Sequence, residues 1–300
     1  MILVIGATGS LGGRITQLLL AQGKQVRVLA RHNSPSVELA KAGMATPLEI
    51  LIHAGAEVVY GDLKDPASLD SACQGVDTLI TTANSVLRGG PDNIESVDLN
   101  GNLNLIAAAR KAGVKHFIFT SALGSSPDHP APLFAAKGKV EQALRQSGLT
   151  FTILAPHLFM DVWAMVVVGI PALHSQPVSL FEPASHRHSM IAAEDVAGYA
   201  VAAVDNPAAR NAYLPMGGPE ALSWKDVAAT FESVLRRPVQ VNLFKPGEDL
   251  PGQPDWVNQM LPALETFEVV LDMSELSKIF GVPPTSLEAF ISRILASAPA

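Results

Sequence analysis

A glycine-rich loop directly follows a short apolar run at the start of the chain. Ile2–Ile5 is apolar throughout, and the residues after it have the spacing G-x-x-G-x-x-G, from Gly6 to Gly12. Apolar residues then recur on one face of an expected helix, which Gly23 ends: Leu11, Ile15, Leu18 and Leu19. The pattern predicts a strand, a tight turn and a helix in immediate succession.

Such a loop has a specific chemical use at a strand-to-helix turn. Glycine lets the backbone approach a pyrophosphate closely, while free N–H groups and the positive end of the helix meet the negative charge. We therefore assign the loop to a cofactor-binding site, with Gly6, Thr8, Gly9, Ser10, Leu11 and Gly12 as contacts. The alternative is the glycine-rich turn of an empty doubly wound fold.

The first half of the chain repeats this alternation of strand and helix. Six runs are expected to be strands buried on both faces: Ile2–Ile5, Val26–Ala30, Glu57–Tyr60, Thr78–Thr81, His116–Thr120 and Phe151–Leu154. Helical stretches stop at Gly113 and Gly148, whereas prolines interrupt residues 31–56, which we interpret as a helix with an inserted turn. The predicted fold class is α/β, with a doubly wound parallel sheet.

After Ala155 the chain changes to proline-punctuated loops, a helix around Glu194–Val204 and further helices. Two of these helices open with capping-box spacing, at Ser223–Asp226 and at Thr285–Glu288. We predict a dinucleotide-binding domain over residues 1–155 and a smaller α+β substrate-binding lobe over residues 156–300. Because no flexible linker separates the two, we expect them to pack together and to be partly interleaved.

Composition narrows the class of protein further. Of 300 residues, 48% are hydrophobic and 16% are charged, and the formal net charge is −7. No basic run exceeds a dipeptide, so neither nucleic acid nor an anionic membrane is an expected partner. Polar residues and proline interrupt the most apolar stretch, Leu149–Leu173, before it reaches the length of a membrane helix. The start of the chain lacks signal-peptide features, and the single cysteine, Cys73, fits a reducing cytoplasm.

The end of the second expected strand indicates which dinucleotide is bound. An NAD site places an acidic residue there to accept hydrogen bonds from the ribose hydroxyls. This chain has Arg31, with Ser34 nearby, and no acidic residue is expected to compete for the site. Because a guanidinium binds a phosphate through two hydrogen bonds, we predict NADP, with NADPH preferred over NADH. The alternative is a solvated arginine at a strand end.

Several motifs together resemble the NmrA-like family of atypical short-chain dehydrogenases/reductases. They are the glycine loop, Arg31, Gly61-Asp62-Leu63, residues 97–102 and 112–117, Lys137 with Glu141, and Asp195-Val196-Ala197. The resemblance spans nearly the whole chain and is firmest over residues 1–160. It implies a Rossmann domain with a small C-terminal lobe and an active site between them. It also implies adenine contacts at Asp62 and Leu63, and nicotinamide-side contacts at Thr82, Ala83 and Asn84.

The expected catalytic residues depart from the typical short-chain reductase pattern, in which a tyrosine stands four residues before a lysine. Leu133 occupies that position before Lys137, and the three tyrosines lie far from it in sequence. Some NmrA-like reductases resemble this arrangement and keep the lysine alone. In that interpretation Lys137 holds the nicotinamide ribose and polarises or protonates the substrate oxygen. The alternative is a surface salt bridge with Glu141, four residues further along the helix.

Other candidates follow the fifth and sixth expected strands, at the carboxyl edge where open α/β sheets bind ligands. Ser121 is expected either to bond a substrate oxygen or to cap a turn. Pro156 and His157 are assigned to the cofactor site, and His157 is alternatively an acid/base group or a structural histidine.

Two further groups in the second lobe were weighed as sites. His186-x-His188 has no third ligand pattern beside it, so no metal site is predicted. Phe159, Met160 and Trp163 either line an apolar pocket or belong to the core.

These observations predict an NADPH-dependent reductase that transfers hydride to a small apolar carbonyl or quinone-type acceptor, acting as a monomer or homodimer. The alternative is a catalytically silent NADP(H)-binding sensor, regulator or assembly factor, a class that the resemblance includes. The absent tyrosine favours the alternative, and the retained lysine favours the reductase.

Overall fold

A computed structural model describes residues 1–32, 46–86 and 90–297. The chain divides into two compact units, each built from two segments. The first unit is Met1–Ala155 with Val196–Pro215, and the second is Pro156–Asp195 with Met216–Ala300. Residues 196–215, which we placed in the second lobe, therefore belong to the first unit.

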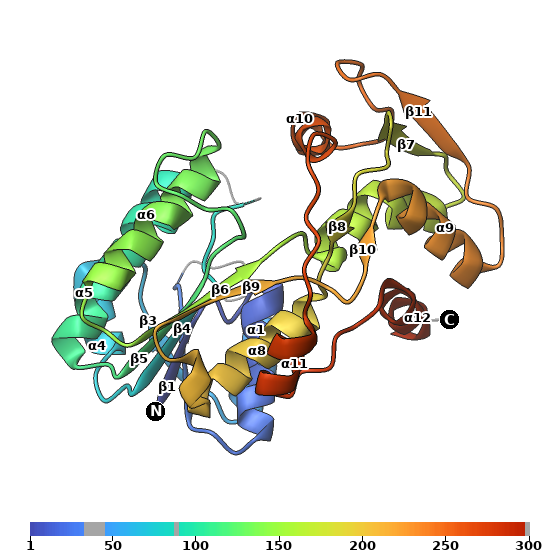
Figure 1. Cartoon of the computed structure of the whole chain (residues 1–300). Coiled ribbons are helices and arrows are strands. Elements are labelled where there is room, and N and C mark those ends of the chain that lie inside the picture. The colour runs from blue at the N-terminus through green and yellow to red at the C-terminus, as the bar shows by residue number, and fades with distance from the viewer. Residues whose placement is uncertain (33–45, 87–89, 298–300) are drawn as a thin grey trace. The chain divides into compact units, whose positions relative to one another are not determined.

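The first unit is built on a seven-stranded sheet in the order β3-β2-β1-β4-β5-β6-β9 (Figure 1). Pairing is parallel, for example from Ile2↔Thr78 to Ile5↔Thr81 between β1 and β4. The strands are β1 (Ile2–Ile5), β2 (Val26–Ala30), β3 (Glu57–Tyr60), β4 (Thr78–Thr81), β5 (His116–Thr120), β6 (Phe151–Pro156) and β9 (Ala212–Met216). The predicted doubly wound parallel sheet is confirmed.

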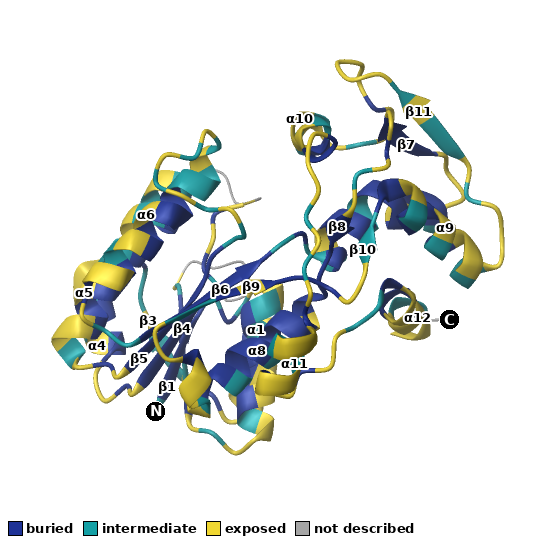
Figure 2. Cartoon of the chain, viewed as in Figure 1, coloured by how far each residue is buried: buried dark blue, intermediate teal, exposed yellow. Residues whose placement is uncertain are grey.

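Helices cover both faces of this sheet (Figure 1). On one face α4 packs on α5 and α5 on α6, while α1 and α8 lie on the other face with α3 beside α1. Their bounds are α1 (Ser10–Ala21), α3 (Pro47–His53), α4 (Pro66–Ala72), α5 (Asn102–Ala112), α6 (Pro132–Gln146) and α8 (Ala193–Asp205), with a π-helical turn η1 (Ile94–Gly101) before α5 and a short 3₁₀ turn η3 (Pro207–Ala209). Figure 2 shows buried strands between helices whose outer faces are exposed.

The two edge strands differ from the sequence expectation. β3 was expected to be buried on both faces, but Glu57 and Tyr60 are exposed and the two valines between them are half-buried. The strand lies at the edge of the sheet, where fewer neighbours cover it. β9, at the other edge, was not predicted, because Pro215 within it argues against a strand anywhere except at an edge.

One of the two capping boxes predicted from the sequence is present in the structure, and the other is not. The predicted capping box at Ser223 is present, since its hydroxyl accepts from the Asp226 N–H at 3.1 Å and the Asp226 carboxylate accepts from the Ser223 N–H at 2.9 Å. The capping box predicted at Thr285 is wrong. Ser286 accepts from the Ala289 N–H at 3.2 Å instead, and Thr285 donates its hydroxyl to Asp195 at 2.6 Å.

The second unit contains one core and two small sheets. β8 pairs antiparallel with β10, and β7 pairs parallel with β11. Its elements are η2 (Met160–Gly169), α7 (Ile170–Leu173), β7 (Val178–Phe181), β8 (His188–Ser189), β10 (Ala221–Leu222), α9 (Trp224–Leu235), β11 (Val241–Phe244), α10 (Asp255–Leu264), α11 (Ser274–Phe280) and α12 (Leu287–Ser297). Met160 and Trp163 belong to the core of this unit, together with Trp224 and Phe231. Across the described residues, no helix is both long and apolar enough to cross a membrane.

Candidate functional site

The glycine loop lies at the carboxyl ends of β1 and β4, where the order of the sheet reverses direction. Ligands of open α/β sheets bind at this position. The loop after β4 is joined to the end of β1, because the Thr82 N–H and hydroxyl both donate to the Ile5 carbonyl, at 3.0 and 3.2 Å. Gly6 has φ +83°, and a Cβ atom on it would stand 2.6 Å from the Thr82 Oγ1. Only glycine fits this turn without strain.

Gly12 fits even more tightly, inside the first turn of α1. A Cβ atom there would stand 2.3 Å from the Gly6 carbonyl oxygen and 2.8 Å from the Thr82 Oγ1. The helix thus packs directly on the backbone of the loop. Gly9 is its N-cap and offers no capping side chain, and the first turn of α1 contains no acidic residue. The first N–H groups of α1 therefore receive no side-chain cap, which suits an anion at this end of the helix.

The remaining residues assigned to this loop lie around the same turn. Thr8 and Leu11 are half-buried, and Ser10 is exposed at the start of α1. The Gly9 N–H donates to the Gly6 carbonyl at 2.9 Å, which closes the turn.

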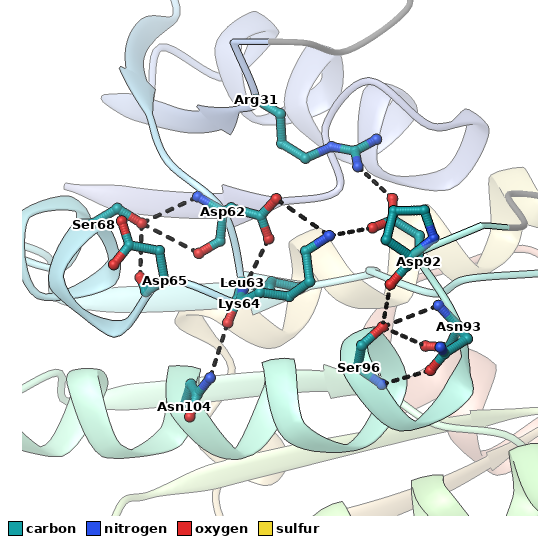
Figure 3. A network of polar contacts seen from close by, with 11 residues as sticks. Arg31, Asp62, Leu63, Lys64, Asp65, Ser68, Asp92, Asn93, Ser96 and Asn104 are labelled. Carbon is teal, nitrogen blue, oxygen red and sulfur yellow. Dashed lines mark hydrogen bonds and ion pairs between the residues drawn. The ribbon is translucent and has the colours of Figure 1, made fainter.

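Arg31 follows β2 and pairs with a carboxylate. Its guanidinium bonds the Asp92 Oδ2, and the Lys64 Nζ lies 2.5 Å from the Asp92 Oδ1 (Figure 3). Asp92 stands 61 residues from Arg31 in sequence, so the expectation that no acidic residue competes for Arg31 is wrong. Ser34, its predicted helper, lies outside the described residues.

Two effects act on the pKa of Asp92 in opposite directions. Burial raises the pKa of this carboxyl, but hydrogen bonds from Lys64 and Arg31 outweigh it, so the pKa is held below its ordinary value. Asp92 therefore remains an anion that neutralises part of the positive charge of both cations.

Asp62 and Leu63 lie in the turn after β3 and are ordered by their neighbours (Figure 3). The Asp62 Oδ1 accepts from the Lys64 N–H at 2.8 Å, and the Leu63 carbonyl accepts from the Asn104 side-chain amide at 3.1 Å. Ser68 accepts from the Asp62 N–H at 3.1 Å. The turn holds Lys64 on the same side as Arg31, because both cations reach Asp92.

The loop after β4 contains the three residues assigned to the nicotinamide side. Thr82 is joined to β1 as described, the Ala83 N–H donates to the Thr81 hydroxyl at 3.4 Å, and Asn84 accepts from the Val86 N–H at 3.2 Å. The next residue, Ser85, donates both its N–H and its hydroxyl to Asp98. This part of the loop is therefore braced against η1.

Lys137 and Glu141 are both buried in α6, at 7% exposure each, so a surface salt bridge between them is excluded. The Lys137 Nζ donates to the Thr120 carbonyl at 2.9 Å and lies 5.3 Å from the centre of the Phe119 ring. Glu141 instead accepts from the Ser121 hydroxyl at 2.5 Å, which is the partner that the structure gives to Ser121.

Burial lowers the pKa of Lys137, and the negative charges of Asp98 and Glu141 oppose that change without reversing it. Burial likewise raises the pKa of Glu141, while the hydrogen bond from Ser121 and the positive charge of Arg145, 3.7 Å away, lower it by less. Each group is thereby closer to its neutral form than an exposed side chain would be.

Asp98 is a residue that sequence reasoning did not single out as functional. Its Oδ2 accepts from the Ser85 hydroxyl at 2.6 Å, whereas its Oδ1 is buried with no hydrogen-bond partner among the described residues. The carboxylate lies near enough to Lys137 to act on its charge. Its only signal in the sequence was its position in the motif of residues 97–102.

Pro156 and His157 begin the second unit. The His188 Nε2 donates to the Leu264 carbonyl at 2.9 Å, so its Nδ1 accepts from the His157 Nε2, 3.0 Å away. This assignment leaves the His157 Nδ1 as an acceptor. Burial, with a smaller contribution from His188, lowers the pKa of His157 to about 3. His157 therefore stays neutral at physiological pH, which disfavours it as a general acid.

Two of the apolar candidates, Met160 and Trp163, and His186 make contacts within the second unit. Trp163 packs edge-on to Trp256, with ring centres 5.0 Å apart. His186 lies 3.3 Å from Glu265. These contacts place Trp163 in the core rather than in a pocket.

Comparisons with known proteins found similarity in both sequence and fold. A model of the NmrA-like family matches residues 1–290. The chain is 32% identical over 240 residues to NAD(P)H azoreductase of Xenophilus azovorans, covering 80% of this chain and 76% of that protein. It is 27% identical over 282 residues to photosystem II assembly factor Ycf39 of Trieres chinensis, covering 92% and 84%. A solved structure with the same fold is the NADPH-dependent quinone oxidoreductase of Escherichia coli complexed with NADPH, with TM-score 0.75, 23% identity and coverage of 98% and 100%.

Proposed function

The chain belongs to the NmrA-like family, and from that premise we propose that it is an NADPH-dependent reductase acting on a small apolar carbonyl or quinone-type acceptor. The observation that carries the proposal is the glycine cradle. Its backbone leaves no room for a Cβ atom at Gly6 or Gly12, and it opens onto the N-terminus of α1. A pyrophosphate fits such a cradle.

The choice of NADPH rests on the cations at the ends of β2 and β3. Arg31 and Lys64 converge on one carboxylate, so the same two groups are able to bind a phosphate on the adenosine ribose. The name of one similar structure supports this choice, since it is an NADPH-dependent quinone oxidoreductase complexed with NADPH, whereas the name NAD(P)H azoreductase covers both cofactors.

When bound, NADPH supplies the hydride, and the residues of this chain provide binding, orientation and a proton. Reduction of a carbonyl or quinone oxygen consumes one proton for each hydride. We assign that proton to the Lys137 ammonium, which the Thr120 carbonyl holds in place. Because burial lowers its pKa, this ammonium is a stronger acid than that of an exposed lysine, and the neutral amine left behind is tolerated in its buried position.

The test compares two lysines of the same helix. Lys137→Met removes the buried ammonium and keeps an apolar stem, whereas Lys139→Met removes the exposed one. We expect Lys137→Met to lower kcat for quinones and aldehydes by about 100-fold or more, with a smaller loss of NADPH affinity, and Lys139→Met to leave both near wild type. Equal kcat values for the two variants would refute the role of Lys137.

A second function is favoured by one feature, the leucine at position 133 where typical short-chain reductases have tyrosine. The similarity to photosystem II assembly factor Ycf39 points in the same direction. In this case the protein binds NADP(H) as a regulator or assembly factor without turnover. Binding of NADPH by the wild-type protein with no oxidation of any quinone, aldehyde or ketone offered would favour it over the reductase.

A further inference from the structure

Arg31 and Lys64 lie together with the Asp92 carboxylate at the carboxyl ends of β2 and β3, and the Asp62 Oδ2 lies 3.8 Å from the Lys64 Nζ (Figure 3). Each oxygen of Asp92 takes one cation, Oδ2 from Arg31 and Oδ1 from Lys64. The Asp92 side chain is 10% exposed, and the two cationic side chains are about one-third exposed, at 32% and 33%. The cations thus reach solvent while the carboxylate between them is covered.

The backbone that presents Asp92 is held on its far side. The Ser96 hydroxyl donates to the Pro91 carbonyl at 2.8 Å, and Asn93 and Ser96 form a capping box at the start of η1. The arrangement keeps the main chain of Asp92 in place while its side chain projects toward Arg31 and Lys64. The Asp92 carboxylate therefore occupies a position where two cations are able to bind an anion.

The location identifies the anion that would replace it. In a doubly wound fold with a dinucleotide at the glycine loop, the end of the second strand faces the adenosine ribose. NADPH carries a phosphate on that ribose, and NADH carries a hydroxyl. Only the first of these competes with a carboxylate for two cations.

We propose that Asp92 is an internal competitor for the 2′-phosphate of NADPH, and that Lys64 is a second ligand of that phosphate beside Arg31. The proposal rests on the proposed use of NADPH. When the phosphate binds, it takes both cations and the Asp92 carboxylate turns to solvent. When NADH binds, the three-residue network of Arg31, Lys64 and Asp92 persists. Asp92 therefore makes the preference for NADPH over NADH smaller than it would be if Asp92 did not pair with Arg31 and Lys64.

The test uses fragments that differ only in this phosphate, 2′,5′-ADP and 5′-AMP, titrated calorimetrically into the whole protein. Breaking part-exposed ion pairs of this kind corresponds to a change of about fivefold to tenfold in affinity. We expect Asp92→Asn to bind 2′,5′-ADP about fivefold to tenfold more tightly than wild type and 5′-AMP within about twofold of it. Arg31→Ala and Lys64→Met should each weaken 2′,5′-ADP binding and leave 5′-AMP nearly unchanged.

The matched control is Asp70→Asn, which removes a negative charge from the same unit at the exposed pair with Lys111. It should leave both fragments at wild-type affinity. Tighter binding of both fragments by Asp92→Asn, or weaker binding of 2′,5′-ADP, would overturn the proposal, as would an equal gain in Asp70→Asn. Thermal unfolding of each variant separates loss of the site from loss of the fold.

The outcomes also separate this inference from the proposed function. If wild type binds 2′,5′-ADP and Asp92→Asn binds it no better, the competitor role fails and the use of NADPH stands. If neither protein binds either fragment, or intact NADPH, both are refuted together.

Discussion

Gly12→Ala tests whether the contact of α1 with the glycine loop is needed for cofactor binding. The new Cβ atom would stand 2.3 Å from the Gly6 carbonyl oxygen, 2.6 Å from its carbonyl carbon and 2.8 Å from the Thr82 Oγ1. Ordinary van der Waals contact begins at 3.4 Å. The first two atoms are backbone, so the loop must retreat by about 1 Å rather than a side chain rotating away.

The expected magnitude is the difference of two effects. Alanine in place of glycine gains up to about 1 kcal/mol of helix propensity in α1. Overpacking against backbone costs about 1–3 kcal/mol or more. With the full gain in propensity, we expect the free energy of unfolding to fall by up to about 2 kcal/mol. NADPH affinity should fall by about tenfold or more, because the loop N–H groups are displaced from the anion they would bind.

Gly13→Ala is the matched control in the next position of the same helix. Its Cβ atom would meet only the Ala7 carbonyl oxygen, at 3.2 Å, so the gain in propensity is nearly the same and the overpacking much smaller. Urea unfolding followed by circular dichroism gives the stability of both variants, and NADPH fluorescence titration gives their affinity. If Gly12→Ala matched Gly13→Ala in both measurements, the close approach would not determine binding.

The remaining predictions concern buried polar groups of each unit. Burial, with Arg210 second, lowers the pKa of His116 to about 4, below its unfolded value near 6.5. The unfolded chain therefore binds the extra proton, and lowering the pH from 7 to 5 should cost about 2 kcal/mol of stability that His116→Gln does not lose. Equal pH dependence of urea unfolding in wild type and variant would contradict this. Asp195→Ala leaves the Thr285 N–H and hydroxyl, now bonded at 2.8 and 2.6 Å, without their acceptor. It should cost about 2–3 kcal/mol, against less than about 1 kcal/mol for Glu194→Ala at the exposed surface, and similar losses in urea unfolding would refute the argument.

Much of the first unit follows from local sequence patterns. The six predicted strands match the observed ones, with β6 two residues longer, because continuous apolar runs flanked by glycine stops are typical of strands in a parallel sheet. The turn at Gly6 also follows from the sequence, since its positive φ requires glycine. The predicted roles of the site residues remain predictions, because they concern ligands.

What could not be predicted depends on contacts between distant segments. Asp92 reaches Arg31 across 61 residues, and nothing in the sequence around either residue indicates the pair. Thr285 has the spacing of an N-cap, but a buried carboxylate 90 residues away takes its hydroxyl, so Ser286 caps the helix. In both cases a buried carboxylate without a partner would destabilise the fold by more than a local sequence preference, such as an N-cap, stabilises it.

The two-segment construction of the first unit has a consequence for synthesis on the ribosome. β6 emerges long before β9, because residues 156–195 of the other unit are made in between. β6 is buried throughout in the complete fold, but during that interval one of its edges has no neighbouring strand. The Thr152 hydroxyl then also lacks the Ala209 carbonyl, to which it donates at 2.6 Å in the complete fold. Open apolar edges pair readily with other chains. A fragment ending at Ala155 would keep that edge permanently and tend to aggregate, whereas one that rejoins residues 196–215 would close it.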